Sequence, residues 1–189
     1  MHNWHKVFPK SGVGKQMVPI LDWIQQMELQ TKSLLDFGCG KGGTMRWLQG
    51  LYPKIAVTGW DIGTEVYRRR PRSQSFDGIY SIDCFEHIEQ QDIPDAIENL
   101  RRISHQDTKW CHIIDMTPAK KRLPDGRNAH VTLLSAPEWQ DMFEVAGCRI
   151  EQIQLFDQPD PNYVQRRRCV IHCEPHPREL GRGRPQHKK

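Results

Sequence analysis

The sequence of 189 residues contains no apolar run close to the roughly 20 residues that a helix needs to cross a bilayer. Its first residues lead into no apolar signal region and no small-residue cleavage site, so nothing in them directs the chain to export. Only 37% of the residues are hydrophobic, and no internal repeat is present. These absences favour a soluble, cytoplasmic protein without a membrane partner. We expect it to be a monomer or a weak dimer.

Cysteine is present but follows no disulfide framework. The six cysteines are scattered through apparent strands and helix starts, which favours reduced thiols in a core. Cys169 and Cys173, with His172 and His176 nearby, suggest zinc at first sight. Four residues along a strand separate the two thiols by about 13 Å, which is too far for one metal ion. We therefore assign no metal there.

The formal net charge of +4 is concentrated in residues 68–70, residues 166–168 and the last dozen residues. We interpret the two arginine triplets as solvated loop faces, and a nucleic-acid partner stays an alternative that nothing else indicates. Beyond Glu174 the sequence is rich in Pro, Gly, Arg and His and has no apolar periodicity. We expect a single domain over residues 1–174 and a disordered basic tail over residues 175–189.

Helical and extended patterns alternate along the chain. A helix with apolar residues from Met17 to Met27 forms an N-terminal cap within residues 1–30. A strand at 34–35, a helix at 44–51 and a strand at 55–60 form a βαβ unit. Further strands are expected at 76–82, 110–114, 150–155 and 169–173, with helices over 93–103 and from the Ser135-to-Glu138 capping box to Gly147. The pattern predicts a doubly wound, mostly parallel α/β sheet flanked by helices.

A long polar connection runs from residue 115 to residue 130 and contains Pro118, Pro124 and Gly126. A loop of this length inside a compact domain is usually functional or mobile. We expect it to cover a site at the carboxyl ends of the strands, where ligands bind in such sheets.

A glycine cluster follows the first strand. Gly38, Gly40 and Gly43 match the G-x-G-x-x-G pattern, and Asp61 stands where a carboxylate for ribose hydroxyls belongs. A dinucleotide would bring an anionic pyrophosphate to this turn, and Asp36 would then face it with like charge. S-adenosylmethionine has no phosphate and carries a cationic amino group and a sulfonium. Asp36 therefore favours S-adenosylmethionine.

This stretch resembles the first motif of small, single-domain class I methyltransferases, which have a Rossmann-like fold: Leu34-Leu35-Asp36-Phe37-Gly38-Cys39-Gly40-Lys41-Gly42. Residues 59–62, 76–88 and 130–148 are similar to three further motifs of that family, in the same order. The resemblance covers about residues 33–155. It implies transfer of a methyl group from S-adenosyl-L-methionine to an O- or N-acceptor, by in-line displacement.

The resemblance also implies which residues contact the cofactor. Asp36 would meet its amino group directly or through water, Asp61 would hold its ribose hydroxyls, and Ile62 would pack on its adenine. The positions carried over are Asp36, Gly38, Cys39, Gly40, Asp61, Ile62, Ile82 and Asp83.

One departure from the family is plain. Only 14 residues lie between Asp61 and Phe76, where the family usually has a helix, a strand and another helix. The region between the second and fourth family strands should therefore be shortened. The acidic residue that usually recognises the adenine amino group from this region has no clear counterpart.

Two histidines are our candidates for a catalytic base, His87 after the third strand of this chain and His130 after the long loop. A structural role, capping a helix or bonding the backbone, is the alternative for each. Asp83, Glu86 and His87 also resemble the metal-binding cluster of the small-RNA 2′-O-methyltransferases. Because a Glu-His pair is widespread in small methyltransferases without metal, we assign no metal to the site.

Two other functions stay open at this point. A noncatalytic S-adenosylmethionine-binding module is compatible with a trimmed sheet, and a nicotinamide-dinucleotide oxidoreductase is compatible with the glycine pattern. The acceptor, whether a small molecule or a macromolecule, is not identified by any motif.

Overall fold

The computed structural model describes residues 17–71, 75–160 and 163–176, with only the backbone for 156–160 and 163–166. Residues 1–16 of the expected cap and residues 177–189 of the expected tail lie outside the described residues. The helices and strands are α2 Val18–Gln26, β1 Ser33–Phe37, α3 Gly43–Leu51, β2 Ala56–Trp60, β3 Phe76–Ile82, η2 Phe85–His87, η3 Gln90–Asp92, α4 Ile93–Arg101, β4 Ser104–Asp115, α5 Ala136–Val145, β5 Cys148–Asp160 and β6 Tyr163–Pro175.

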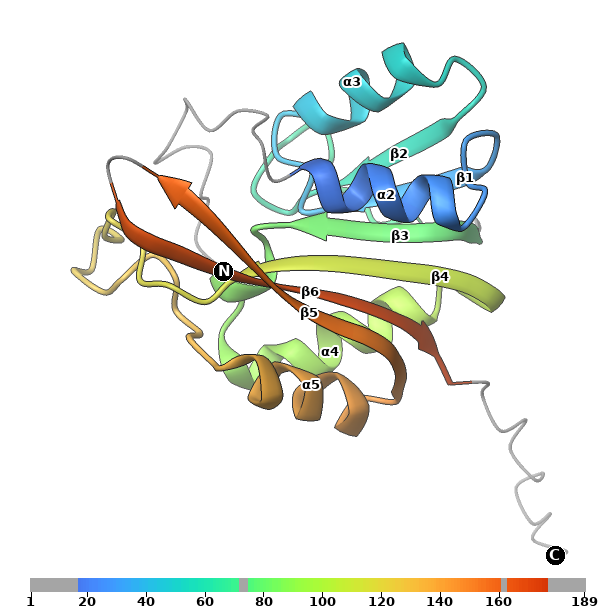
Figure 1. Ribbon diagram of the computed structural model, residues 1–189. Coiled ribbons are helices and arrows are strands. Elements are labelled where there is room, and N and C mark those ends of the chain that lie inside the picture. Colours follow the sequence, from blue (N-terminus) through green and yellow to red (C-terminus); the bar gives the residue numbers. More distant parts are fainter. Residues whose placement is uncertain (1–16, 72–74, 161–162, 177–189) are drawn as a thin grey trace, which may run out of the picture.

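The strands form one sheet in the order β2-β1-β3-β4-β6-β5, with helices on both faces (Figure 1). The first four strands pair in parallel, and β6 pairs antiparallel with both β4 and β5. Five strands therefore run in one direction and only β6 runs against them, which confirms the predicted fold class. The last two strands are longer than predicted, and β6 inserts between β4 and β5, which the sequence did not indicate.

The shortened region is also confirmed. β2 is at the edge of the sheet, and the described part of the connection from residue 61 to residue 75 contains only turns and bends. Asp61 N donates a hydrogen bond to Tyr67 O at 2.9 Å, which folds this short connection back on itself. The sheet accordingly ends at β2 within the described residues.

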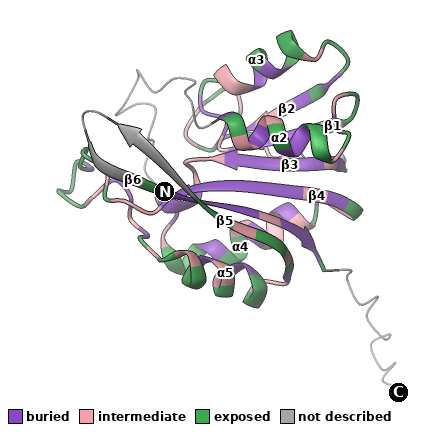
Figure 2. Cartoon of the chain, in the orientation of Figure 1, coloured by how far each residue is buried: buried purple, intermediate pink, exposed green. Residues whose placement is uncertain are grey.

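The central strands are largely buried (Figure 2), and hydrophobic clusters lie on both faces of the sheet. Successive side chains of a strand point to opposite faces, so Leu34 packs with Trp23 of α2 while Leu35 packs on the side of Trp139 of α5. Trp23 and Trp139 are no more than 1% exposed. Burying a large apolar side chain contributes about 1.5 to 3 kcal/mol, so these two residues anchor the two layers of helices.

The helix boundaries follow the local signals. The expected capping box is present at α5, where Ser135 N donates to Glu138 Oε2 at 2.7 Å. Gly147 follows α5 with φ +87°, a left-handed conformation that favours glycine. None of the described helices is long and apolar enough to span a membrane.

All six cysteines are free thiols, and five of them are buried, as expected for a reduced core. Cys169 and Cys173 lie on one uninterrupted strand, opposite Ile114 and Trp110 of β4 respectively. The strand does not break between them, so the two thiols are not brought together for a shared metal ion.

Candidate functional site

The glycine loop leaves β1 and turns sharply before α3. Gly38 and Gly40 adopt positive φ angles of +77° and +55°. A Cβ on Gly38 would lie 2.3 Å from Cys84 Sγ, so only glycine fits between the loop and the segment after β3. The loop is therefore packed directly against residues that follow the neighbouring parallel strand.

Asp36 lies at the carboxyl end of β1 and is 3% exposed. Burial raises its pKa from 3.8 to about 7, Tyr80 beside it opposes that change, and the charge of Asp61 adds to it. Within the described residues, Asp36 Oδ2 and Tyr80 Oη have no hydrogen-bond partner. A buried carboxylate with an unpaired oxygen favours a ligand that brings a positive charge or a donor.

Asp61 links the loop to the end of β2. Its Oδ2 accepts a hydrogen bond from Gly40 N at 2.8 Å, and its Oδ1 accepts one from Gly63 N at 2.7 Å. Ile62, the next residue, is 39% exposed although it is a large apolar side chain. Cys39 is buried against β2, where a Cβ on Gly59 would lie 2.7 Å from its Sγ. The structure thus brings the predicted residues of the first two strand ends together.

Two further predicted residues follow β3. Ile82 is half-buried and packs with the core on the α2 side. Asp83 has a φ of +47°, and its two carboxylate oxygens accept hydrogen bonds from Arg168 Nε at 2.8 Å and Nη2 at 2.9 Å. The carboxylate of Asp83 is therefore engaged in an ion pair with β6.

Arg168 corrects a prediction. The sequence predicts that the arginine triplet at residues 166–168 is a solvated loop face. These residues instead lie in β6, and the Arg168 side chain is 1% exposed. It also approaches Asp115 Oδ2 at 3.5 Å. Arg168 directly precedes the apolar run from Cys169 to Cys173, and that adjacency was the available sequence signal for a buried position.

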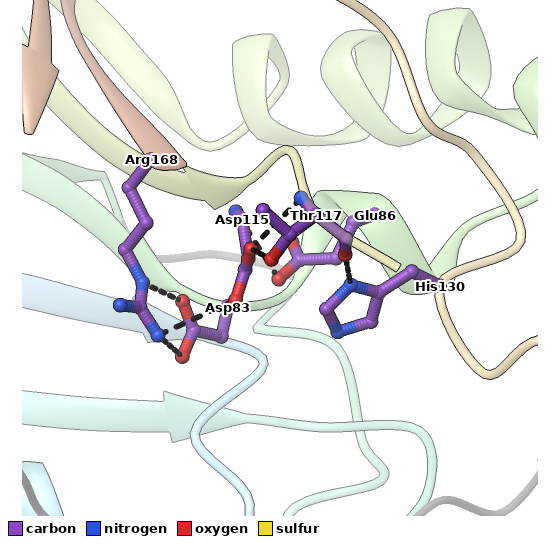
Figure 3. A network of polar contacts seen from close by, with 6 residues as sticks. All are labelled: Asp83, Glu86, Asp115, Thr117, His130 and Arg168. Carbon is purple, nitrogen blue, oxygen red and sulfur yellow. Dashed lines mark hydrogen bonds and ion pairs between the residues drawn. The ribbon is translucent and has the colours of Figure 1, made fainter. Parts of the chain in front are cut away.

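A network of polar contacts extends from this ion pair toward the end of β4 (Figure 3). Asp115 Oδ1 accepts hydrogen bonds from Thr117 N at 3.0 Å and from Thr117 Oγ1 at 2.5 Å. Asp115 N donates to Glu86 Oε1 at 3.3 Å. Glu86 is fully buried, and burial, followed by the charge of Asp83, raises its pKa well above the usual range. Its Oε2 has no hydrogen-bond partner within the described residues.

His87 and His130, the two predicted catalytic residues, lie against each other. Their rings are T-shaped with centroids 4.8 Å apart. His87 Nδ1 is 2.7 Å from Ala129 O, and His130 Nδ1 is 2.5 Å from Thr117 O. Burial, together with the neighbouring His130, lowers the pKa of His87 to about 4. His87 is therefore neutral at pH 7.

The long loop after β4 folds back on itself and delivers His130. Arg122 and Asn128 form an isolated antiparallel bridge. Asn128 Oδ1 accepts hydrogen bonds from Ala119 N at 3.0 Å and from His130 N at 2.9 Å. Thr132 N then donates to Glu86 O at 3.1 Å, which fixes the returning limb against the segment after β3. The loop thus lies against the segment that carries Glu86 and His87.

One group of side chains has the donor atoms of a metal site. Glu86, His87 and His130 each offer a ligand atom, and these atoms all lie within 4.8 Å of one another. Asp83, which the sequence alternative included, is not in this group, and its carboxylate forms an ion pair with Arg168. Across residues 17–71, 75–155 and 167–176, no other three His, Cys, Asp or Glu side chains place their ligand atoms this close together.

A family of known proteins matches most of this chain. Residues 15–153 match the sequence model of a family described as "Methyltransferase domain". No curated protein sequence matches this chain.

Solved structures with similar folds are numerous. A Burkholderia thailandensis 1,6-didemethyltoxoflavin-N1-methyltransferase, with bound 1,6-didemethyltoxoflavin and S-adenosylhomocysteine, has a TM-score of 0.67 and 15% identity, and the match covers 93% of this chain and 84% of that one. An S-adenosylmethionine-dependent methyltransferase from Clostridium acetobutylicum has a TM-score of 0.62 and 10% identity, covering 92% and 96%. DhpI in complex with S-adenosylhomocysteine has a TM-score of 0.57 and 16% identity, covering 85% and 88%.

Proposed function

Because this chain belongs to the methyltransferase domain family, we propose that it methylates an oxygen or nitrogen atom of a small-molecule acceptor held beside His87 and His130. The methyl donor is S-adenosylmethionine, which supplies the methyl group on a positively charged sulfur. The family assignment decides against the nicotinamide oxidoreductase and the noncatalytic binding module.

The observation that carries the proposal is the buried carboxylate of Asp36. It lies at the carboxyl end of β1, beside the glycine loop, and its Oδ2 has no hydrogen-bond partner within the described residues. A cationic amino group would supply both the donor and the charge that this carboxylate lacks. The residues therefore fit S-adenosylmethionine better than a ligand with phosphate at this turn.

The other strand ends would hold the remaining parts of the cofactor. The backbone of Gly38, Cys39 and Gly40 would contact the methionine part, and the exposed Ile62 would pack on adenine. Asp61 would exchange one of its backbone hydrogen bonds for the ribose hydroxyls. Ile82 and the backbone of Asp83 would line the site from β3, while the Asp83 carboxylate stays paired with Arg168.

The acceptor would lie beside His87 and His130. It would then be on the far side of the segment that follows β3, as seen from the glycine loop. Methyl transfer from sulfonium requires mainly that donor and acceptor are aligned in a dry pocket. The imidazole of His87, which is neutral at pH 7, or that of His130 would accept the proton from a hydroxyl or amine. A small-molecule acceptor is supported by the toxoflavin-type acceptor bound in the Burkholderia enzyme.

Calorimetric titration with S-adenosylhomocysteine tests the cofactor part of the proposal. We expect dissociation constants from below 1 μM to tens of μM, which correspond to about 6 to 8 kcal/mol. Asp61→Ala should weaken binding, whereas Asp141→Asn, an exposed change on α5, should not. The absence of binding by the wild type would contradict the proposal.

Release of S-adenosylhomocysteine from S-adenosylmethionine, followed across a panel of small hydroxyl and amine compounds, tests the acceptor class. Methylation of at least one such compound, with loss of turnover in His130→Ala, is the expected result. Methylation only of a nucleic acid or protein fraction would reject the small-molecule class.

A further inference from the structure

Three side chains from two separate segments converge behind the β3 strand end. We propose that Glu86, His87 and His130 bind one divalent transition-metal cation, through Glu86 Oε2 and the Nε2 atoms of the two histidines. Each of the three side chains offers a ligand atom, and these atoms lie within 4.8 Å of one another. Around a cation at about 2.1 Å they would be about 3.4 Å apart, so adjustments of about 1 Å in side-chain position complete the site.

The hydrogen bonds of the two imidazoles select the coordinating nitrogen. Ala129 O and Thr117 O are carbonyl oxygens, which can only accept, so Nδ1 of His87 and of His130 must donate. In each neutral ring the lone pair is then on Nε2. Metal-binding histidines in proteins typically have this arrangement, with the other ring nitrogen donating to a carbonyl or carboxylate.

Glu86 supplies the third ligand. Its side chain is fully buried, Oε1 accepts a hydrogen bond from Asp115 N, and Oε2 has no hydrogen-bond partner within the described residues. A buried carboxylate oxygen left without a donor is costly, and a cation compensates it directly. The contact with Asp115 orients the carboxylate, as an outer-shell hydrogen bond does in metal sites.

The surrounding charges favour a cation as well. Among the six residues of the network in Figure 3, Arg168 is the single arginine, and three residues are carboxylates: Asp83, Glu86 and Asp115. Arg168 pairs with Asp83 and approaches Asp115. Glu86 Oε2 accepts no hydrogen bond from Arg168 within the described residues, so an added positive charge would compensate this oxygen.

The donor set indicates the class of ion and its use. Two imidazole nitrogens and one carboxylate oxygen suit Zn²⁺, Fe²⁺, Co²⁺ or Ni²⁺ better than Mg²⁺ or Ca²⁺, which prefer oxygen ligands. Three protein ligands leave coordination positions open. One open position would bind a hydroxyl oxygen of the acceptor, and this assignment rests on the proposed function. The cation would lower the pKa of that hydroxyl, whose proton would leave to water. In the cation-bound protein His87 and His130 would therefore act as ligands, and neither would be the proton acceptor.

The location agrees with such a role. Cys84, two residues before Glu86, has its Sγ 2.3 Å from the position of a Cβ on Gly38. The segment that carries the ligands thus contacts the glycine loop, and it also contacts the loop carrying His130 through Thr132 N to Glu86 O and His87 Nδ1 to Ala129 O. A cation held here would lie between the cofactor site and the returning limb of the loop.

Metal titration of the full-length protein after chelator treatment tests the proposal. Calorimetry with Zn²⁺, and visible absorption with Co²⁺ as a spectroscopic probe, should detect one tight equivalent with a dissociation constant of 1 μM or lower. His130→Ala and Glu86→Gln should weaken that equivalent by at least tenfold and shift the Co²⁺ absorption. His172→Ala, a change to a half-buried histidine of β6 outside the group, should leave both unchanged.

Three results would overturn the cation site: no uptake by the wild type, equal uptake by all variants, or a loss in His172→Ala as large as in His130→Ala. Circular dichroism of each variant checks folding, and His130→Ala decides the matter if the buried Glu86→Gln change prevents folding. S-adenosylhomocysteine binding is measured on the same samples. Its absence with the cation site intact would reject the proposed function alone, whereas cofactor binding without cation uptake would reject only the site.

Discussion

Replacement of Asp36 by Asn should stabilise the ligand-free protein while weakening its cofactor binding. In the folded chain the pKa of Asp36 rises from 3.8 to about 7, chiefly because the carboxylate is buried. The folded state therefore holds this proton more tightly than the unfolded state, so stability falls as pH rises from about 4 to about 7. At pH 8 the full cost of the charge is present, and the difference in pKa corresponds to about 4 kcal/mol.

The isosteric amide removes that charge, so Asp36→Asn should raise the free energy of unfolding at pH 8 by about 2 to 4 kcal/mol. At pH 4 the variant and the wild type should differ little, since the wild-type carboxyl is then protonated in the folded state. Urea denaturation at pH 4, 6 and 8 measures this, with Asp141→Asn as the exposed control.

Cofactor binding should show the opposite dependence. Because the ionised carboxylate is the form that attracts a cationic amino group, the wild-type affinity for S-adenosylhomocysteine should fall about tenfold for each pH unit below 7. Asp36→Asn should bind at least tenfold more weakly at pH 8 and should lack this pH dependence. A destabilised Asp36→Asn protein at pH 8, or a wild-type affinity that is flat from pH 5 to pH 8, would refute the reasoning.

Three further substitutions have defined outcomes. Gly38→Ala places a Cβ 2.3 Å from Cys84 Sγ at a φ of +77°, so we expect a loss of about 1 to 3 kcal/mol in urea denaturation, with weaker cofactor binding by calorimetry. Arg168→Met leaves Asp83 without its ion-pair partner, and thermal unfolding at pH 7 should show a loss of about 3 kcal/mol. Trp139→Ala empties a fully buried position and should cost about 3 to 5 kcal/mol in urea denaturation without changing the stoichiometry of cofactor binding.

The fold was largely readable from local pattern. The strands appear as short apolar runs because both faces of the central sheet are covered, and β3 has the predicted bounds of residues 76 and 82. The capping box of α5 and the glycine after it mark the ends of that helix without reference to the rest of the chain. The short connection after Asp61 likewise fixed the missing part of the sheet by length alone.

The glycine loop was readable for a related reason. Gly38, Gly40 and Gly42 adopt positive φ angles at one turn, and Asp36 lies two residues before the first of them, so the whole pattern is contiguous. A contiguous pattern can be recognised in a single sequence because the backbone geometry of the turn constrains residues that are neighbours in the chain.

The proposed acceptor side of the site depends on tertiary structure. β6 inserts beside β4, and this pairing brings Arg168 against Asp83 and removes that carboxylate from any metal group. The folded loop after β4 brings His130 to His87. No local propensity encodes either contact, because each depends on how strands and loops distant in sequence pack around one buried network. The sequence by itself determined the strands and helices, the glycine loop and the donor that suits Asp36, whereas the place of β6 in the sheet and the partners of Asp83, Glu86 and His87 were fixed only when the chain folded.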